Sequence, residues 1–230
     1  MIDLMFAKEF FRTHRETGAI APSSNGLGRA LARYVDRSRE PGRAWGGGKG
    51  LGFEAGRGIL EVGPGTGTVT RHIVRALGPA DTLDLIEANP RFARRMADGL
   101  SRDPVLSRAA DRVRLHSGFV QDLTLGQYDA IVCGLPFANF DAETAGTIFD
   151  RLLGALAPGG TLSFFAYAGV PALRRSLTTG PSRIRTLGVQ SVLDRVLTEH
   201  RFAQDFVLGN LPPARVHHLR VSTALLPAAI

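Results

Sequence analysis

Apolar and polar positions along this chain predict strands and helices in succession. An apolar run at 59–62 has a β-branched end, and Val69, Ile73, Val74 and Leu77 follow it at helical spacing. Glycines lie between the two segments, where they let the backbone turn sharply and let a ligand approach. This stretch therefore predicts a strand, a tight glycine turn and an amphipathic helix.

The same succession continues along the chain. Further strands are predicted at 82–87, 113–116, 128–133 and 161–167, and helices at 91–100 and 141–156. Asp141 is expected to cap the second of these helices, and Pro158-Gly159-Gly160 to end it. Residues 172–198 are basic and helical in parts. Two last strands, near 203–208 and 216–223, are expected to pair antiparallel. We therefore predict an α/β fold with a doubly wound, mostly parallel, seven-stranded sheet.

The first 17 residues have the pattern of an amphipathic helix. Its apolar stripe includes Ile2, Met5, Phe6 and Phe10, and its cations are Lys8, Arg12 and Arg15. Such a helix can lie in a membrane interface or pack on its own domain, and the pattern leaves both open. A further helix begins near Leu27, and either Ser23 or Ser24 can cap it. A hydroxyl in that place can also hold a carboxylate.

The net charge of the chain indicates which class of binding partner to expect. The chain has 28 Lys and Arg against 21 Asp and Glu, a formal net charge of +7. A basic surface indicates a polyanionic partner, either nucleic acid or an anionic membrane. The single cysteine, Cys133, excludes an internal disulfide and a Cys-based zinc site. No apolar run reaches the roughly 18–20 residues of a membrane span, so we expect a soluble or peripheral protein.

The candidate chemistry begins at the first glycine turn. Glu61 ends the strand, the turn reads Gly63-Pro64-Gly65-Thr66-Gly67, and Glu87 ends the next strand. A carboxylate at that place can accept both hydroxyls of a ribose. The glycines alone would also suit a Rossmann dinucleotide loop. The whole set resembles the cofactor site of class I S-adenosylmethionine-dependent methyltransferases. That resemblance implies that Glu61 serves the methionine end of S-adenosylmethionine.

The turn after the third strand departs from that superfamily. There it holds the adenine, and an acid usually follows its glycine. Here Phe119 follows Gly118, so either Asp122 contacts the adenine or no acid does. Phe119 and Val120 are the alternative, sandwiching the ring between them.

Four motifs together resemble the bacterial phospholipid N-methyltransferases. They are Gly18-Ala19-Ile20-Ala21-Pro22-Ser23-Ser24, the glycine turn, Gly134-Leu135-Pro136-Phe137 and Asn210-Leu211-Pro212-Pro213-Ala214. The resemblance implies stepwise methylation of phosphatidylethanolamine toward phosphatidylcholine. It also implies binding to anionic membranes through residues 1–17, at the inner face of the cytoplasmic membrane. We divide the chain into N-terminal helices at 1–36, a glycine-rich connector at 37–56 and a methyltransferase core at 57–230.

Two other functions stay open. The Gly134-Leu135-Pro136-Phe137 turn is also similar to the N-L-P-Y turn of ribosomal RNA adenine dimethyltransferases, with Gly134 in place of Asn. That family usually adds a helical C-terminal domain, which is not expected here, so we do not expect nucleic acid as the partner. The third hypothesis is a membrane-binding protein that holds the cofactor without catalysis.

For a lipid amine, the catalytic candidates follow from the chemistry. Backbone carbonyls of Gly134 and Leu135 can accept hydrogen bonds from the amine and orient its lone pair. Tyr167, at the carboxyl end of a strand, can hold the amine or assist proton loss. Phe137, Tyr167 and Tyr34 offer aromatic faces to a methylated, cationic nitrogen. Arg174 and Arg175 are candidates for the lipid phosphate. We expect no metal, because His116, His217 and His218 lack partners at metal-ligand spacing.

Overall fold

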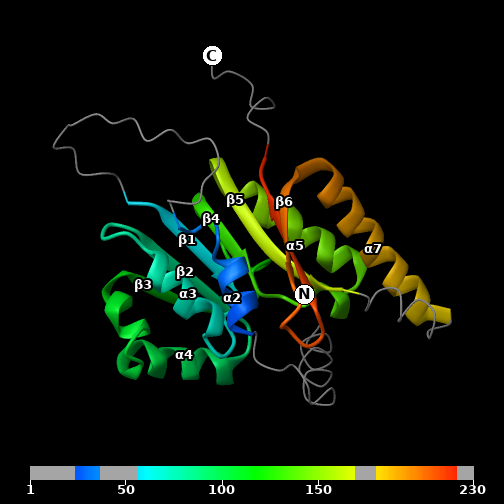
Figure 1. Ribbon diagram of the computed structural model, residues 1–230. Helices are drawn as coiled ribbons and strands as arrows, with labels where there is room; N and C mark the ends of the chain where they lie inside the picture. The colour runs from blue at the N-terminus through cyan, green and yellow to red at the C-terminus, as the bar shows by residue number, and fades with distance from the viewer. Residues whose placement is uncertain (1–23, 37–55, 169–179, 222–230) are drawn as a thin grey trace.

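The computed structural model describes residues 24–36, 56–168 and 180–221 (Figure 1), with side chains from residue 184 onward in the last range. Several expectations lie outside these residues. They concern the helix at 1–17, Ser23, nearly all of the connector at 37–56, and Arg174 and Arg175. The division into three segments therefore stays a prediction.

Seven strands form one sheet in the order β3-β2-β1-β4-β5-β7-β6. The strands are β1 (Gly58–Val62), β2 (Thr82–Glu87), β3 (Val113–Ser117), β4 (Tyr128–Cys133), β5 (Leu156–Tyr167), β6 (Arg201–Val207) and β7 (Ala214–Leu219). The first five pair in parallel, and β7 lies antiparallel between β5 and β6. The predicted fold class is confirmed.

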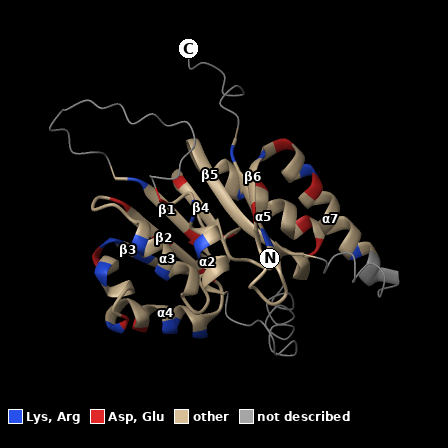
Figure 2. Cartoon of the chain, viewed as in Figure 1, with Lys and Arg blue, Asp and Glu red and all other residues tan. Residues whose placement is uncertain are grey.

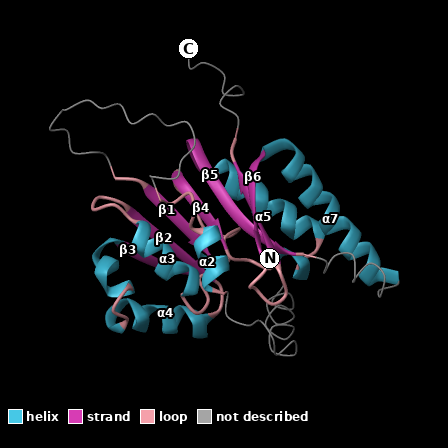
Figure 3. Ribbon diagram, viewed as in Figure 1, coloured by secondary structure: helices cyan, strands magenta, loops and turns pink. Residues whose placement is uncertain are grey.

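Helices cover both faces of the sheet (Figure 3). They are α2 (Asn25–Leu31), α3 (Thr68–Ala76), α4 (Pro90–Arg102), α5 (Ala142–Gly154) and α7 (Gly180–His200). Side chains alternate along β1, so Ile59 packs with α2, α3 and α4, whereas Leu60 packs with α5 and α7. Each face of β1 is thus buried against a different apolar cluster, which fixes the register of this central strand.

The boundary between α5 and β5 differs from the sequence prediction. Asp141 does cap the helix, since its side chain accepts a hydrogen bond from the Thr144 nitrogen at 2.7 Å. The helix ends at Gly154, however, and β5 begins at Leu156, so Pro158-Gly159-Gly160 lies within the strand. The pairing with β4 shifts register over this segment. A Cβ at Gly160 would lie 2.9 Å from the Tyr128 oxygen, so glycine permits the close approach to β4.

Residues 180–200 form a single helix where the sequence indicated helical parts only. Val189, Leu193 and Val196 of α7 are buried in the core on the α5 side of the sheet. Packing against that face therefore stabilises α7, which Figure 1 shows lying beside α5.

The parallel strands bring their carboxyl ends to one edge of the sheet. Two backbone hydrogen bonds join the turns there: Gly63 nitrogen donates to Ile86 oxygen at 2.9 Å, and Gly134 nitrogen to Val62 oxygen at 2.8 Å. In open α/β sheets, ligands bind at this edge. The glycine turn, Glu87 and the Gly134-Leu135-Pro136-Phe137 segment therefore meet where a ligand is expected.

Candidate active site

The glycine turn after β1 needs its glycines for backbone conformation. Gly63, Gly65 and Gly67 have φ values of 74°, 55° and 80°, which side-chain-bearing residues rarely adopt. A Cβ at Gly63 would also lie 2.9 Å from Leu135 Cδ2. The turn can therefore pass close under the segment that follows β4.

Glu87 is held against this turn. Its Oε2 accepts a hydrogen bond from the Gly65 nitrogen at 3.0 Å, and its Oε1 accepts one from the Asn89 nitrogen at 2.8 Å. Burial raises the pKa of the carboxyl, while the backbone donors of Asn89 and Gly65 act in the opposite direction. A carboxylate oxygen has two lone pairs, so each oxygen can still accept a ribose hydroxyl.

A first pocket opens beside Glu87. The turns after β1 and β3 and the segment after β4 line it, with Gly63, Phe119, Val120, Gln121 and Leu135. The predicted adenine residues Phe119 and Val120 thus lie together with Gly63 and Glu87. We call this cavity the cofactor pocket.

Gln121 lines the cofactor pocket, in place of the Asp122 that the sequence offered as a contact for the adenine. The Asp122 side chain is exposed and does not line the cofactor pocket, whereas Gln121 does. A carboxamide both donates and accepts, so Gln121 can pair with the edge of an adenine. Sequence reasoning missed Gln121, because the superfamily pattern directs attention to an acid beside the glycine.

Glu61 offers a buried oxygen without a partner. The residue is 1% exposed, and its Oε2 has no hydrogen-bond partner among the described residues. Burial raises the pKa of the carboxyl to about 8; the Thr70 hydroxyl lowers it and the Glu87 charge raises it further. An ammonium group would satisfy this oxygen and favour its charged form. The site therefore fits the amino group at the methionine end of S-adenosylmethionine.

Ser24 caps α2 as expected. Its Oγ accepts a hydrogen bond from the Leu27 nitrogen at 3.2 Å, and its own nitrogen donates to Asn210 Oδ1 at 3.2 Å. The hydroxyl proton remains for donation, so Ser24 can still bind a carboxylate. Asn210 belongs to the Asn210-Leu211-Pro212-Pro213 motif, which thereby holds the start of α2.

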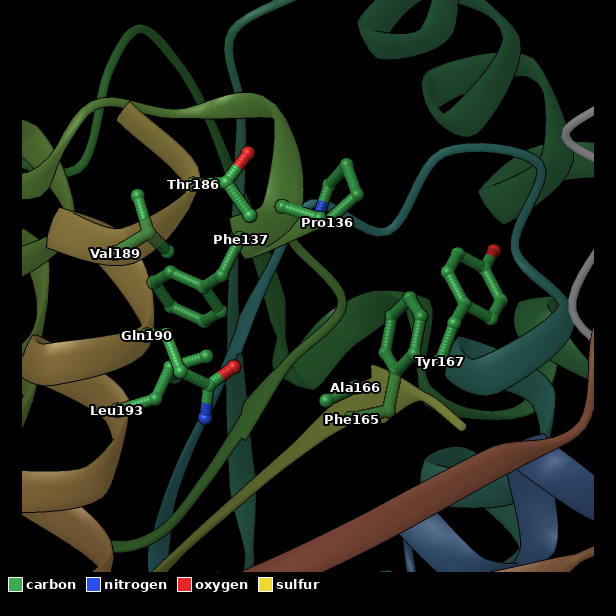
Figure 4. Close-up of a pocket in the computed structure, with 10 residues that line it drawn as sticks. Pro136, Phe137, Phe165, Ala166, Tyr167, Thr186, Val189, Gln190 and Leu193 are labelled. Carbon is green, nitrogen blue, oxygen red and sulfur yellow. The ribbon is translucent and has the colours of Figure 1, made fainter. Parts of the chain in front are cut away.

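A second pocket lies beside the segment after β4 (Figure 4). Pro136 and Phe137 line it together with Phe165 and Tyr167 of β5 and residues of α7. Leu135 instead lines the cofactor pocket. The Gly134-Leu135-Pro136-Phe137 segment thus separates two cavities, and we call the second one the acceptor pocket.

The aromatic candidates differ in their surroundings. Tyr167 is half-buried, its ring meets Phe165 edge-to-face at 5.2 Å, and burial raises the pKa of its phenol. Phe137 is only 2% exposed, and its ring stacks on Phe149 with centroids 4.3 Å apart. Most of the Phe137 ring therefore packs in the core, and the half-buried Tyr167 presents more aromatic surface to the acceptor pocket.

Tyr34 lies away from both pockets. It is 3% exposed and packs edge-to-face on Phe202, at 5.1 Å between centroids, and on His218, at 4.6 Å. The structure therefore does not bring Tyr34 together with Tyr167, and it assigns Tyr34 to packing between α2 and the β6–β7 pair.

Three further observations limit the chemistry. Within residues 24–36, 56–168 and 180–221, no helix is long and apolar enough to span a bilayer. The same residues contain no cluster of three His, Cys, Asp or Glu side chains that could hold a metal. Cys133 is fully buried, and burial raises the pKa of its thiol to about 12, so it is not a nucleophile at neutral pH.

Comparison with known proteins agrees with this geometry. Residues 60–162 match the family model of a methyltransferase domain. That segment of the chain is therefore similar to a methyltransferase domain. The match includes the glycine turn, Glu87, Phe119 and Gly134, and it stops before Tyr167 and α7. The cofactor pocket therefore belongs largely to the shared domain, whereas one wall of the acceptor pocket lies outside it.

Solved methyltransferases share the fold. The O-methyltransferase TomG from Streptomyces achromogenes, in complex with SAM, gives a TM-score of 0.60 at 18% identity, covering 96% of this chain and 92% of that chain. The O-methyltransferase from Bacillus cereus, in complex with SAH, gives 0.58 at 14% identity, covering 95% and 91%. The expected class I methyltransferase fold is thus confirmed.

One curated relative is a lipid methyltransferase. The ornithine lipid N-methyltransferase of Singulisphaera acidiphila is 26% identical over 159 residues, which cover 69% of this chain and 74% of that protein.

Proposed function

We propose that this methyltransferase transfers methyl groups from S-adenosylmethionine to the amine of a membrane aminolipid, phosphatidylethanolamine and its mono- and dimethylated forms. The observation that carries the proposal is the division of the sheet edge into two pockets. The Gly134-Leu135-Pro136-Phe137 segment has the cofactor pocket on one side and a largely apolar acceptor pocket on the other. Donor and acceptor can therefore meet across one short turn.

The polar groups described above account for binding of the methyl donor, S-adenosylmethionine. Bound S-adenosylmethionine supplies a methyl group that its sulfonium makes electrophilic. Glu87 accepts from the ribose hydroxyls, Glu61 pairs with the amino group, and Ser24 donates to the carboxylate. Gln121 and Phe119 hold the adenine. These contacts fix the direction in which the methyl group is presented.

The acceptor side must hold an amine and let its proton leave. A carbonyl oxygen of Gly134 or Leu135 accepts a hydrogen bond from the amine and directs its lone pair toward the cofactor pocket. Because burial raises the pKa of Tyr167, its phenol stays neutral. Tyr167 therefore orients the amine and does not act as a base, and the proton leaves to solvent. As methyl groups accumulate, the rings of Tyr167 and Phe165 bind the cationic nitrogen.

An anionic membrane surface remains the proposed place of action. The net charge of +7 favours such a surface. Exposed Arg91, Arg94, Arg95 and Arg102 lie on α4, which follows β2 at the carboxyl edge (Figure 2). Together with the expected basic helix at 1–17, they support peripheral binding at the inner face of the cytoplasmic membrane.

Ornithine lipid is the second candidate acceptor. The relative from Singulisphaera acidiphila carries this substrate in its name. Ornithine lipid and phosphatidylethanolamine both offer a primary amine on a lipid headgroup, so the same pocket chemistry suits either.

An acceptor panel tests the proposal. Purified protein and methyl-labelled S-adenosylmethionine are mixed with vesicles containing phosphatidylethanolamine or ornithine lipid, or with ribosomal RNA. Label in phosphatidylethanolamine supports the proposal, and label in ornithine lipid alone would establish the second candidate acceptor instead. Label in RNA alone would establish the RNA alternative. Cofactor binding without transfer to any acceptor would favour a non-catalytic role.

A further inference from the structure

The α7 wall of the acceptor pocket carries a carboxamide that the function described so far does not use. Gln190 lies between Val189 and Leu193, and all three line the pocket opposite Phe165 and Tyr167 (Figure 4). Thr186, one turn earlier on α7, is the only other polar side chain that this helix contributes to the pocket among the described residues. A polar group in such a wall is placed to orient a ligand.

A neighbouring acid pairs with the nitrogen end of this carboxamide, in a hydrogen bond exposed to solvent. The Nε2 of Gln190 donates to Asp194 Oδ1 at 2.8 Å, one turn along α7. An ionised carboxylate only accepts, so the amide nitrogen must be the atom that faces Asp194. Oε1 is thereby held away from Asp194, and Figure 4 shows it on the side of β5.

We propose that Gln190 Oε1 accepts a hydrogen bond from the acceptor nitrogen and so favours acceptors that still carry N–H. The inference rests on the proposed function and deepens it. A neutral primary amine has two N–H groups, so it can donate one to a carbonyl of the turn and one to Oε1 while its lone pair stays free for transfer. A monomethyl amine has one N–H group, which it can donate to Oε1. A neutral dimethyl amine has none. Gln190 is thus a positioning residue for the first and second methylations and not for the third.

The test compares three acceptors in one vesicle system. Wild type and Gln190→Leu are assayed on phosphatidylethanolamine and on its monomethyl and dimethyl forms. Leucine suits the apolar wall and removes Oε1, together with the Nε2 that donates to Asp194. We expect kcat/KM to fall roughly tenfold for the first two lipids, the cost of one lost hydrogen bond to an amine, and to change little for the dimethyl lipid.

Two variants separate positioning from folding. Gln204→Leu changes an exposed glutamine on β6 and should leave all three rates unchanged. Gln190→Glu keeps an acceptor but makes it anionic, which favours the protonated amine. Its KM should fall, its kcat at pH 7 should fall, and its kcat should recover as pH rises. A purely structural role would not produce this pH profile.

Each outcome decides a different claim. Loss confined to the two N–H-bearing lipids supports the inference. An equal loss on all three lipids, or no loss on any, overturns it while leaving the proposed function standing. Failure of the wild-type protein to methylate any of the three lipids overturns the proposed function, and this inference with it.

Discussion

The backbone nitrogen of Gly65 donates a hydrogen bond to Glu87 Oε2 at 3.0 Å, which ties the turn after β1 to the end of β2. One carboxylate thereby both shapes the glycine turn and faces the cofactor pocket. Loss of that carboxylate should therefore weaken cofactor binding and also loosen the glycine turn.

Replacement of Glu87 tests this relationship. Glu87→Ala removes the two proposed ribose contacts, and the affinity for S-adenosylhomocysteine should fall about 10- to 100-fold, as for hydrogen bonds to a charged group. Calorimetric titration measures the affinity. Asp150→Ala removes an exposed acid on α5 and should bind as tightly as wild type. Equal affinities for Glu87→Ala and wild type would contradict the assignment.

The glycine turn can be tested at Gly63. Gly63→Ala must place a Cβ at a φ of 74° and 2.9 Å from Leu135 Cδ2. The conformational strain alone should lower the free energy of unfolding by about 1–2 kcal/mol, and the displaced turn should weaken cofactor binding. Urea denaturation and calorimetry measure the two effects. Gly126→Ala is the matched control, because its added Cβ meets nothing within 4 Å.

Glu61 gives the ligand-free fold a dependence on pH. Burial raises the pKa of its carboxyl from 4.5 to about 8, so between these values the folded chain holds a proton that the unfolded chain has lost. The free energy of unfolding should therefore fall as pH rises through this range, by at most about 1.4 kcal/mol per pH unit from this group. Glu61→Gln cannot titrate, so its urea denaturation between pH 5 and 8 should show a shallower fall. Identical slopes for the two proteins would contradict the burial argument.

Tyr34 should matter for stability and not for binding. Tyr34→Ala leaves a cavity against Phe202 and His218 and should cost about 3 kcal/mol in the free energy of unfolding. Affinity for S-adenosylhomocysteine should stay the same at temperatures where the variant is folded. Phe206→Ala, at a 53% exposed position on β6, should cost far less. A loss of cofactor affinity in Tyr34→Ala without a loss of stability would show that Tyr34 belongs to the binding site.

The sequence predicted the parts of the site that depend on local chemistry. Gly63, Gly65 and Gly67 all have positive φ, as a tight turn between a strand and a helix demands. Glu61 and Glu87 follow from their places at the ends of adjacent parallel strands. The same reasoning predicted the sheet, because alternating apolar segments specify strands and helices in order.

The parts that depend on tertiary packing were not predictable. Gln190 and Gln121 reach the two pockets only because α7 and the turn after β3 pack at the carboxyl edge, and neither lies in a motif. Tyr34 and Phe137 failed in the opposite way. Their aromatic character suggested contact with a ligand, but packing places both rings in the core. The α5–β5 boundary was misplaced because Gly159 and Gly160 serve the register of β5 and not the end of the helix.

The most direct test of the central claim is transfer of labelled methyl groups to phosphatidylethanolamine in vesicles, with and without anionic lipid, followed by chromatography of the products. The account predicts label in mono- and dimethylated lipid and more transfer when anionic lipid is present. Absence of label from every lipid fraction, with S-adenosylmethionine binding intact, would contradict it.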